Sequence, residues 1–209
     1  MVLSLPMYDG FFRYGPVEID YLTQQDPALG QAIERIGMLE RPVIPDPFAA
    51  LVHSVVAQQI SGKAAATVSR RLVERLGAIT PATVGAAPLE DIQRCGLSLR
   101  KASTIKGLSD AVAEGALDLD ALPTLPDDEV IARLSALRGI GVWTAEMILI
   151  FSLQRPDVVS WGDLGIRRGM MTLYGRDDLD RAAFDRYRAR YSPFGSVASL
   201  YLWRVAAGE

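Results

Sequence analysis

The 209-residue sequence contains a single cysteine and a single histidine. One cysteine excludes an internal disulfide and any structural zinc or iron–sulfur site that needs four cysteines. A transition-metal site would have to rely on carboxylates, and no cluster of them stands out. A Ser-His-Asp triad would have only His53 to use. We therefore expect no cofactor and no metal held by side chains.

Long apolar runs are also missing from the sequence. No run reaches the ~18–20 residues that a helix needs to cross a bilayer. Residues 1–6 lack the basic region and apolar core of a secretory signal. We expect no membrane partner and a cytoplasmic location. The apolar fraction of 49% is still high enough for a buried interior in one large domain or two small ones.

The chain lacks an overall excess of positive charge, since 22 lysines and arginines stand against 25 acids for a formal net charge of −3, but the positive charge is unevenly distributed. Residues 61–110 hold eight lysines and arginines against four acids, whereas residues 1–60 hold three against seven. An acidic protein with one basic face can still bind a phosphate backbone there. A solvated helical face would produce the same charge pattern, so charge alone does not decide between the two interpretations.

Helix start signals recur along the chain, whereas strand patterns are weak and confined to the first 20 residues. Asp26 and Asp46 each precede a proline, which places a capping residue and a first-turn proline before a helix. We expect an all-α protein of about ten helices. After the two that begin at residues 27 and 47, the expected helices cover approximately residues 61–76, 88–94, 98–113, 126–137, 142–153, 164–174, 178–189 and 192–206.

The most informative stretch runs from residue 137 to residue 163. Gly139 and Gly141 form a Gly-x-Gly turn between two apolar helical segments. Glycines permit positive φ and leave backbone N–H groups bare, and the start of a helix suits an anion such as phosphate. A solitary carboxylate, Asp163, follows about one helix later, in an N-cap position. It is either a plain helix cap or a reactive group.

Residues 137–145 resemble the helix-hairpin-helix of the DNA glycosylase superfamily, and the spacing to Asp163 matches the aspartate of that superfamily. Residues 57–61, 162–169 and 192–204 resemble its 3-methyladenine DNA glycosylase II (AlkA-like) branch. The resemblance, which spans roughly residues 18–207, implies a helical fold with a cleft between two helical subdomains.

The resemblance also implies a shortened form of that branch. Its members often carry a preceding β-rich domain, of which only a remnant would fit here. We predict an N-terminal segment at residues 1–45 that packs on a helical core at residues 46–209. The helix-hairpin-helix of this core is predicted at about residues 130–153.

The implied activity is that of a monomeric, monofunctional glycosylase of base excision repair. It would flip alkylated purines such as 3-methyladenine out of double-stranded DNA and hydrolyse the N-glycosidic bond. Bifunctional relatives carry a lysine where this chain has Trp143, which has no amine for a Schiff base, so we expect no lyase activity. The alternative is a helix-hairpin-helix module that binds DNA without catalysis, although such a module needs neither the carboxylate nor the tryptophans.

The resemblance assigns the catalytic role to Asp163, whose carboxylate would stabilise a cationic sugar and orient the attacking water. Trp143 and Trp203 match the family's pocket tryptophans, and a tryptophan face attracts a cationic purine by ~0.5–2 kcal/mol. Met147 is expected beside Trp143, and Trp161 is a weaker pocket candidate. Each tryptophan is also an ordinary core candidate.

The remaining predicted site residues would contact DNA. The family's wedge position matches Gln59, with Gln58 beside it, although a polar helix end explains both residues equally well. Backbone groups of the hairpin would hold a phosphate, and its carbonyls near Arg138 and Ile140 would bind a monovalent cation. The predicted DNA-binding residues are Gln58, Gln59, Gly139, Gly141 and Thr144.

Overall fold

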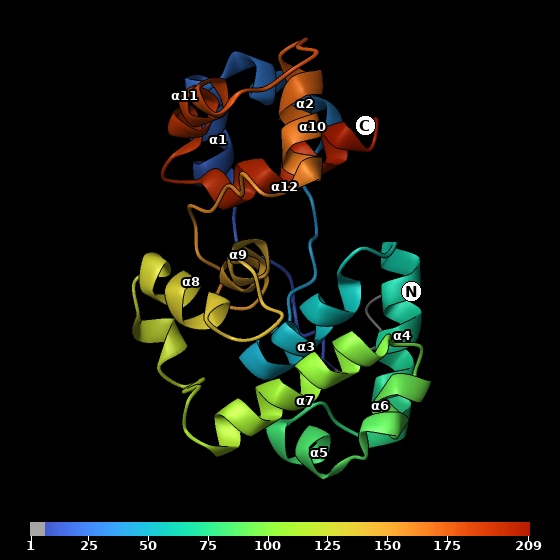
Figure 1. The fold of residues 1–209 in the computed structure, drawn as a ribbon. Helices are drawn as coiled ribbons and strands as arrows, with labels where there is room; N and C mark the ends of the chain where they lie inside the picture. The colour runs from blue at the N-terminus through green and yellow to red at the C-terminus, as the bar shows by residue number, and fades with distance from the viewer. Residues whose placement is uncertain (1–6) are drawn as a thin grey trace. The chain divides into compact units, whose positions relative to one another are not determined.

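The computed structural model describes residues 7–209, and this part of the chain forms twelve α-helices, one 3-10 helix and no β-strand (Figure 1). The all-α prediction is confirmed. None of these helices is both long and apolar enough to span a bilayer. Residues 1–6, where we predict no secretory signal, lie outside the described residues.

The chain divides into two compact units that are each described by themselves. Among the described residues, the first contains residues 7–10 together with Pro42–Leu153, and the second contains Phe11–Arg41 together with Gln154–Glu209. The predicted N-terminal segment is therefore shared between the units. Its origin as a remnant of a leading domain stays a prediction.

The first unit is organised around α3, which packs against α4, α7 and α9 and buries seven of its eleven residues. In helix α9, six of the ten residues are buried. The unit comprises α3 (Pro47–Ala57), α4 (Gly62–Leu76), α5 (Pro81–Ala86), α6 (Leu89–Arg94), α7 (Leu99–Ala113), the 3-10 helix η1 (Leu122–Thr124), α8 (Asp127–Ser135) and α9 (Val142–Phe151).

The second unit is organised around its last helix, α12, which buries nine of its twelve residues. In Figure 1 this helix lies beneath the other helices of its unit, and it packs against α10, α2 and α11. The unit comprises α1 (Pro16–Gln25), α2 (Pro27–Ile36), α10 (Leu164–Leu173), α11 (Arg181–Tyr191) and α12 (Gly195–Ala206).

The predicted capping residues are confirmed. The Asp26 and Asp46 carboxylates accept hydrogen bonds from the backbone N–H groups of Leu29 at 3.0 Å and Ala49 at 2.7 Å. Ser61 and Ser98 cap α4 and α7 in the same way.

The estimate of about ten helices was too low because α1 and α5 were not predicted. Helix α1 has no side chain at its cap, since Gly15 precedes it. Helix α5 is only six residues long, although Thr80 before Pro81 is a valid cap signal. The last two helices begin later than predicted, at Arg181 and Gly195.

A buried carboxylate ties the second unit together. Asp26 is 1% exposed, and besides capping α2 it accepts a 2.7 Å hydrogen bond from the Tyr174 hydroxyl and a 3.1 Å ion pair from Arg190. Burial raises the pKa of Tyr174, so its hydroxyl stays a donor at neutral pH. This contact joins the start of α2 to the ends of α10 and α11.

Two glycines allow α10 and α12 to approach closely. A Cβ atom built on Gly165 would lie 2.7 Å from Cδ1 of Trp203, and one built on Gly169 would lie 2.2 Å from the backbone oxygen of Leu202. The two glycines are one helical turn apart and therefore lie on the same face of α10. Glycine is needed on this face because any side chain would push α12 away.

We predict that Gly169→Ala destabilises the protein by about 1–3 kcal/mol, because its methyl group would meet backbone rather than a movable side chain. Thermal or urea unfolding of the full chain would measure the loss. Gly107→Ala in α7 is the matched control, since no described atom lies within 4 Å of its Cβ, and it should be neutral or stabilising by up to about 1 kcal/mol. Equal stability of the two variants would contradict this account of the packing.

Candidate functional site

The predicted helix-hairpin-helix is formed by α8, α9 and the turn between them. The turn closes with a 3.1 Å hydrogen bond from the Ile140 N–H to the Leu137 carbonyl, and Ile140 is buried beneath it. Gly139 has φ 86°, and a Cβ there would lie 2.4 Å from Oγ1 of Thr104. The fold therefore requires glycine at position 139.

Gly141 has a different role from Gly139. Its φ is −104°, which other residues adopt, and a Cβ there would meet no described atom within 4 Å. Gly141 is the N-cap of α9 and offers no capping side chain, so the first-turn N–H groups of this helix have no partner of that kind. The neighbouring Val142 is 54% exposed, so this helix start lies at the surface, where the helix dipole favours an anion.

Gln58 is tied to the hairpin. Its Nε2 donates to the Gly139 carbonyl at 3.2 Å and to Oγ1 of Thr144 at 3.3 Å. Thr144 is only 2% exposed, and its hydroxyl oxygen already accepts the Gln58 amide, so its predicted contact with DNA stays a prediction. The amide of Gln58 thus fixes the end of α3 against the turn.

Lys101 reinforces the same junction. Its Nζ donates to the carbonyls of Val56 at 2.8 Å and Gln58 at 2.6 Å, where the C-terminal end of α3 presents unpaired carbonyls. Partial burial lowers the pKa of Lys101. The amine of Lys101, a residue in the first turn of α7, therefore caps the end of another helix.

The side chain of Gln59 is exposed, unlike that of Gln58, which is bonded to the hairpin. Gln59 has φ 58°, the left-handed region that few residues other than glycine occupy. Ile60 beside it is 41% exposed, although it is a large apolar residue. The turn between α3 and α4 therefore presents one amide and one apolar side chain at the surface, which is the placement expected of a wedge.

The hairpin also contains oxygen ligands suited to a monovalent cation. In the described part of the chain, the carbonyl oxygens of Arg138 and Ile140 accept no hydrogen bond, whereas those of Leu137 and Gly139 do. Hard cations prefer oxygen donors of this kind. The cation remains a prediction, and no group of three or more His, Cys, Asp or Glu side chains among residues 7–209 could hold a metal.

Asp163 lies in the second unit, where it caps α10 and is 8% exposed. Its Oδ1 accepts a 2.8 Å hydrogen bond from the Ile166 N–H and a 3.0 Å hydrogen bond from Nε1 of Trp203. Gly165 makes the second bond possible because it leaves room for the indole. The carboxylate is therefore held by its own helix and by α12.

The structure brings together some of the predicted pocket residues within each unit. In the second unit it pairs Trp203 with Asp163. In the first, Trp143 and Met147 lie one turn apart on α9, where Trp143 is half-buried and Met147 is buried. The positions of these side chains agree with the predicted roles but do not test them.

Trp161 is engaged elsewhere in the second unit. Its ring packs edge-on against Phe184 at 5.1 Å between centroids, and the guanidinium carbons of Arg167 and Arg181 lie 4.5 Å and 5.5 Å from the ring centroid. These contacts describe a structural aromatic–cation cluster. A pocket role for Trp161 stays a prediction.

Comparisons with known proteins agree with this arrangement. Residues 52–190 match the model of the HhH-GPD superfamily base excision DNA repair proteins. The chain is 33% identical over 169 residues to DNA-3-methyladenine glycosylase 1 of Schizosaccharomyces pombe, which covers 77% of this chain and 73% of that protein.

Solved structures are similar over nearly the whole chain. A DNA-3-methyladenine glycosidase from Bacillus halodurans is 36% identical with a TM-score of 0.79, covering 95% of this chain and 92% of that one. The S. pombe 3-methyladenine DNA glycosylase in complex with abasic DNA is 28% identical with a TM-score of 0.83, covering 90% and 96%. With its helix-hairpin-helix and the aspartate that caps α10, this chain belongs to the HhH-GPD superfamily of base excision DNA repair proteins.

Proposed function

We propose that the protein is a monofunctional DNA glycosylase, active as a monomer, that hydrolyses the N-glycosidic bond of alkylated purines in double-stranded DNA. The observation that carries this proposal is the Asp163 carboxylate, which the Ile166 N–H and the Trp203 indole hold in a fixed orientation. The relatives and structural neighbours named as 3-methyladenine glycosylases support the class of substrate.

The hairpin supplies a backbone grip on the DNA. The N–H groups at the start of α9 would bind one phosphate, and Gly141 leaves the space for it. Such a contact carries no sequence information, which suits an enzyme that must find damage in any sequence.

Excision requires the damaged nucleotide to leave the base stack, at a cost of a few kcal/mol that is smaller for a damaged base. Gln59 would fill the vacated space and hydrogen-bond the orphaned base with its amide. Ile60 adds an apolar surface, and apolar side chains are the common wedge between bases. Gln58 serves the fold instead, since its amide is bonded to the hairpin.

The reaction itself develops positive charge on the deoxyribose as the base departs. The Asp163 carboxylate would stabilise this charge and orient or deprotonate the attacking water. The Ile166 N–H and the Trp203 indole already bind this carboxylate before the reaction, so they need no reorganisation as the charge develops.

An alkylated purine such as 3-methyladenine already carries a positive charge and is a good leaving group. It therefore needs no strong general acid, and the only histidine has other contacts: His53 lies 3.2 Å from the Tyr8 hydroxyl and 3.0 Å from Oγ of Ser69. The indole faces of Trp143 and Trp203 would attract the cationic base. The same features predict poor activity on neutral, stable lesions.

Lyase activity would require an amine to form a Schiff base with the sugar. The chain has three lysines, Lys63, Lys101 and Lys106, and none of them lies in the helix-hairpin-helix. Lys101 binds carbonyls at the end of α3, and Lys106 binds the carbonyls of Val84, Gly85 and Ala87. The hairpin position that carries the lysine in bifunctional relatives is Trp143. These observations support a hydrolytic reaction alone.

We predict that Asp163→Asn lowers the single-turnover rate of base release from methylated duplex DNA by at least about 100-fold while DNA binding persists, because the charge that stabilises the cationic sugar is lost. Trp203→Phe keeps an aromatic ring but removes the indole donor, and it should give an intermediate loss. Equal rates for wild type and Asp163→Asn would remove Asp163 from the mechanism. If the wild type released no methylated purine, a non-catalytic DNA-binding module would be favoured instead.

The two hairpin glycines give a second, separable prediction. Gly141→Ala should leave the unfolding midpoint near that of the wild type but weaken DNA binding about tenfold, since its methyl group would enter the phosphate position. Gly139→Ala should instead destabilise the fold, because its Cβ would meet Thr104 and its φ is positive. Fluorescence anisotropy and thermal unfolding would test both, and full affinity of Gly141→Ala would contradict the phosphate grip.

We also predict that the product strand stays intact after base release. A 5′-labelled methylated duplex should be cleaved only after alkali treatment, and borohydride should trap no protein–DNA adduct. The alkali-treated sample is the internal control, since it shows that abasic sites have formed. A borohydride-trapped adduct would show that an amine attacks the sugar, contrary to the proposal.

A further inference from the structure

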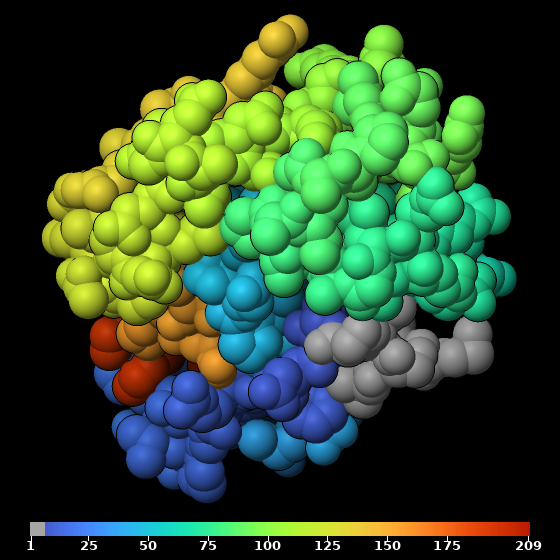
Figure 2. Space-filling view, turned by 90° about the horizontal axis from the view of Figure 1, so that it is seen from below, coloured from blue at the N-terminus to red at the C-terminus, as the bar shows by residue number. Residues whose placement is uncertain are grey.

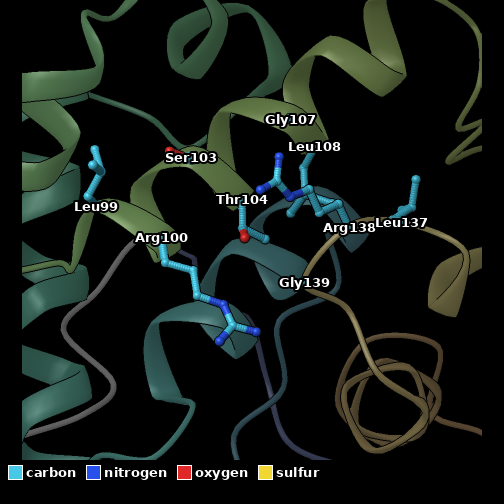
Figure 3. A pocket seen from close by; sticks show the side chains of 9 residues that line it. All are labelled: Leu99, Arg100, Ser103, Thr104, Gly107, Leu108, Leu137, Arg138 and Gly139. Atoms are coloured by element: carbon cyan, nitrogen blue, oxygen red, sulfur yellow. The ribbon is translucent and has the colours of Figure 1, made fainter.

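A pocket of about 620 Å³ lies in the first unit between one face of α7 and the hairpin turn (Figure 3). Its α7 wall consists of positions spaced by one helical turn, and its other wall is the turn that precedes Gly141. The volume lies within the range of ligand-binding pockets. The lining residues are Leu99, Arg100, Ser103, Thr104, Gly107, Leu108, Leu137, Arg138 and Gly139.

The pocket carries unbalanced positive charge. Arg100 comes from α7 and Arg138 from the hairpin, and no acidic residue is among the described residues that line it. Neither guanidinium forms a hydrogen bond or ion pair with any residue that the structure describes, whereas Arg75, Arg94 and Arg133 on other helices of this unit all pair with acids. Arginines left without acidic partners at a pocket indicate an anionic ligand.

The hydroxyl groups of the pocket point to the same kind of ligand. Thr104 is 8% exposed, yet within residues 7–209 its hydroxyl has no hydrogen-bond partner. Ser103 likewise has none among the described residues. The Thr104 hydroxyl oxygen is not one of the described side-chain atoms that are both fully buried and unpaired, so it remains open to the pocket. A phosphate oxygen would supply the acceptor that Thr104 lacks.

The location of the pocket indicates which phosphate this is. Gly139 lines the pocket, and Gly141, two residues later, opens the helix start that would grip the first phosphate. The apolar rim adds a second feature, because Leu99 is 56% exposed and would suit the sugar carbons of a nucleotide rather than an isolated ion. Figure 2 shows that the part of the chain from α4 to α7, which contains most of the residues in the basic stretch 61–110, forms one continuous surface of this unit.

We propose that this pocket binds a second backbone phosphate, with its deoxyribose, on the DNA strand that the hairpin grips. Arg100 and Arg138 would contact the phosphate from opposite walls, and the Thr104 hydroxyl would donate to it. The inference rests on the proposed function only in that the protein binds DNA through its hairpin. It adds a second anchor that fixes the direction of the strand across the first unit.

Binding of the full chain to a duplex that contains an abasic-site analogue tests the proposal, measured by fluorescence anisotropy between about 50 and 200 mM salt. Arg100→Gln and Arg138→Gln should each weaken binding about tenfold and lower the salt slope by about 1, as the loss of one phosphate contact requires. Arg186→Gln on α11 is the matched control, since it removes one exposed arginine from the other unit, and it should keep the wild-type slope. An equal effect of all three substitutions would reduce the finding to net charge and overturn the proposal.

A steric variant separates the pocket from its charge. Gly107 lines the pocket, and a Cβ there meets no described atom within 4 Å, so Gly107→Leu would fill the space without altering the charge or the helix. We expect weaker DNA binding, by about the same tenfold factor, with an unfolding midpoint at or above that of the wild type. Wild-type affinity for Gly107→Leu would overturn the proposal even if the arginine variants bind weakly.

Neutral methylphosphonate linkages, placed one at a time along the damaged strand, identify the bound phosphate. At one position of the strand, a methylphosphonate linkage should weaken DNA binding by the wild type. The same linkage should have little further effect on DNA binding by Arg138→Gln or Arg100→Gln. If no linkage behaves in this way, the strand does not occupy the pocket. In the contrary outcome, inorganic phosphate would bind the pocket of the wild type without displacing DNA, and would fail to bind Arg100→Gln. That result would identify a small-anion site and overturn the assignment to DNA.

These outcomes are independent of catalysis. A wild-type protein that releases no methylated purine but shows the predicted salt slopes would refute the proposed function and leave the second anchor standing. Normal base release by the wild type, with salt slopes unchanged in the arginine variants, would support the proposed function and refute the second anchor.

Discussion

The close approach of α10 and α12 is the constraint on which the position of the Asp163 carboxylate depends. Gly165 and Gly169 present backbone instead of side chains to α12, and this brings the Trp203 indole within 3.0 Å of Asp163. A carboxylate that only caps its helix could be oriented by one amide. Here a second donor comes from a helix some 40 residues later in the sequence, so the packing of α12 in the interior of the unit also sets the orientation of the Asp163 carboxylate.

The sequence predicts much of this arrangement because its strongest signals are local. Asp26 and Asp46 are followed by prolines, and a cap with a first-turn proline is a signal that needs no tertiary context. The Gly-x-Gly turn with Asp163 at a fixed offset also depends on spacing alone. The short α5 and the uncapped α1 were missed, because the first offers few residues for a periodic pattern and the second begins after a glycine.

Contacts between distant segments could not be predicted in this way. Lys101 looks exposed in sequence, and only the fold brings its amine to the carbonyls of Val56 and Gln58. Gln58 and Gln59 are identical in type and adjacent, yet one braces the hairpin and the other projects from a left-handed turn. The contact between Trp161 and Phe184 could not be predicted either, because no sequence pattern indicates that these two segments pack together.

The second unit is assembled from two stretches of chain, Phe11–Arg41 and Gln154–Glu209, whereas the helices of the first unit are contiguous. Domains tend to fold as units while the chain emerges from the ribosome. The first unit can therefore complete its core during synthesis, while α1 and α2 must wait for the last helix to be translated. Since Trp203 is on α12, the Asp163 carboxylate gains its second donor only once α12 has been made and has packed against α10.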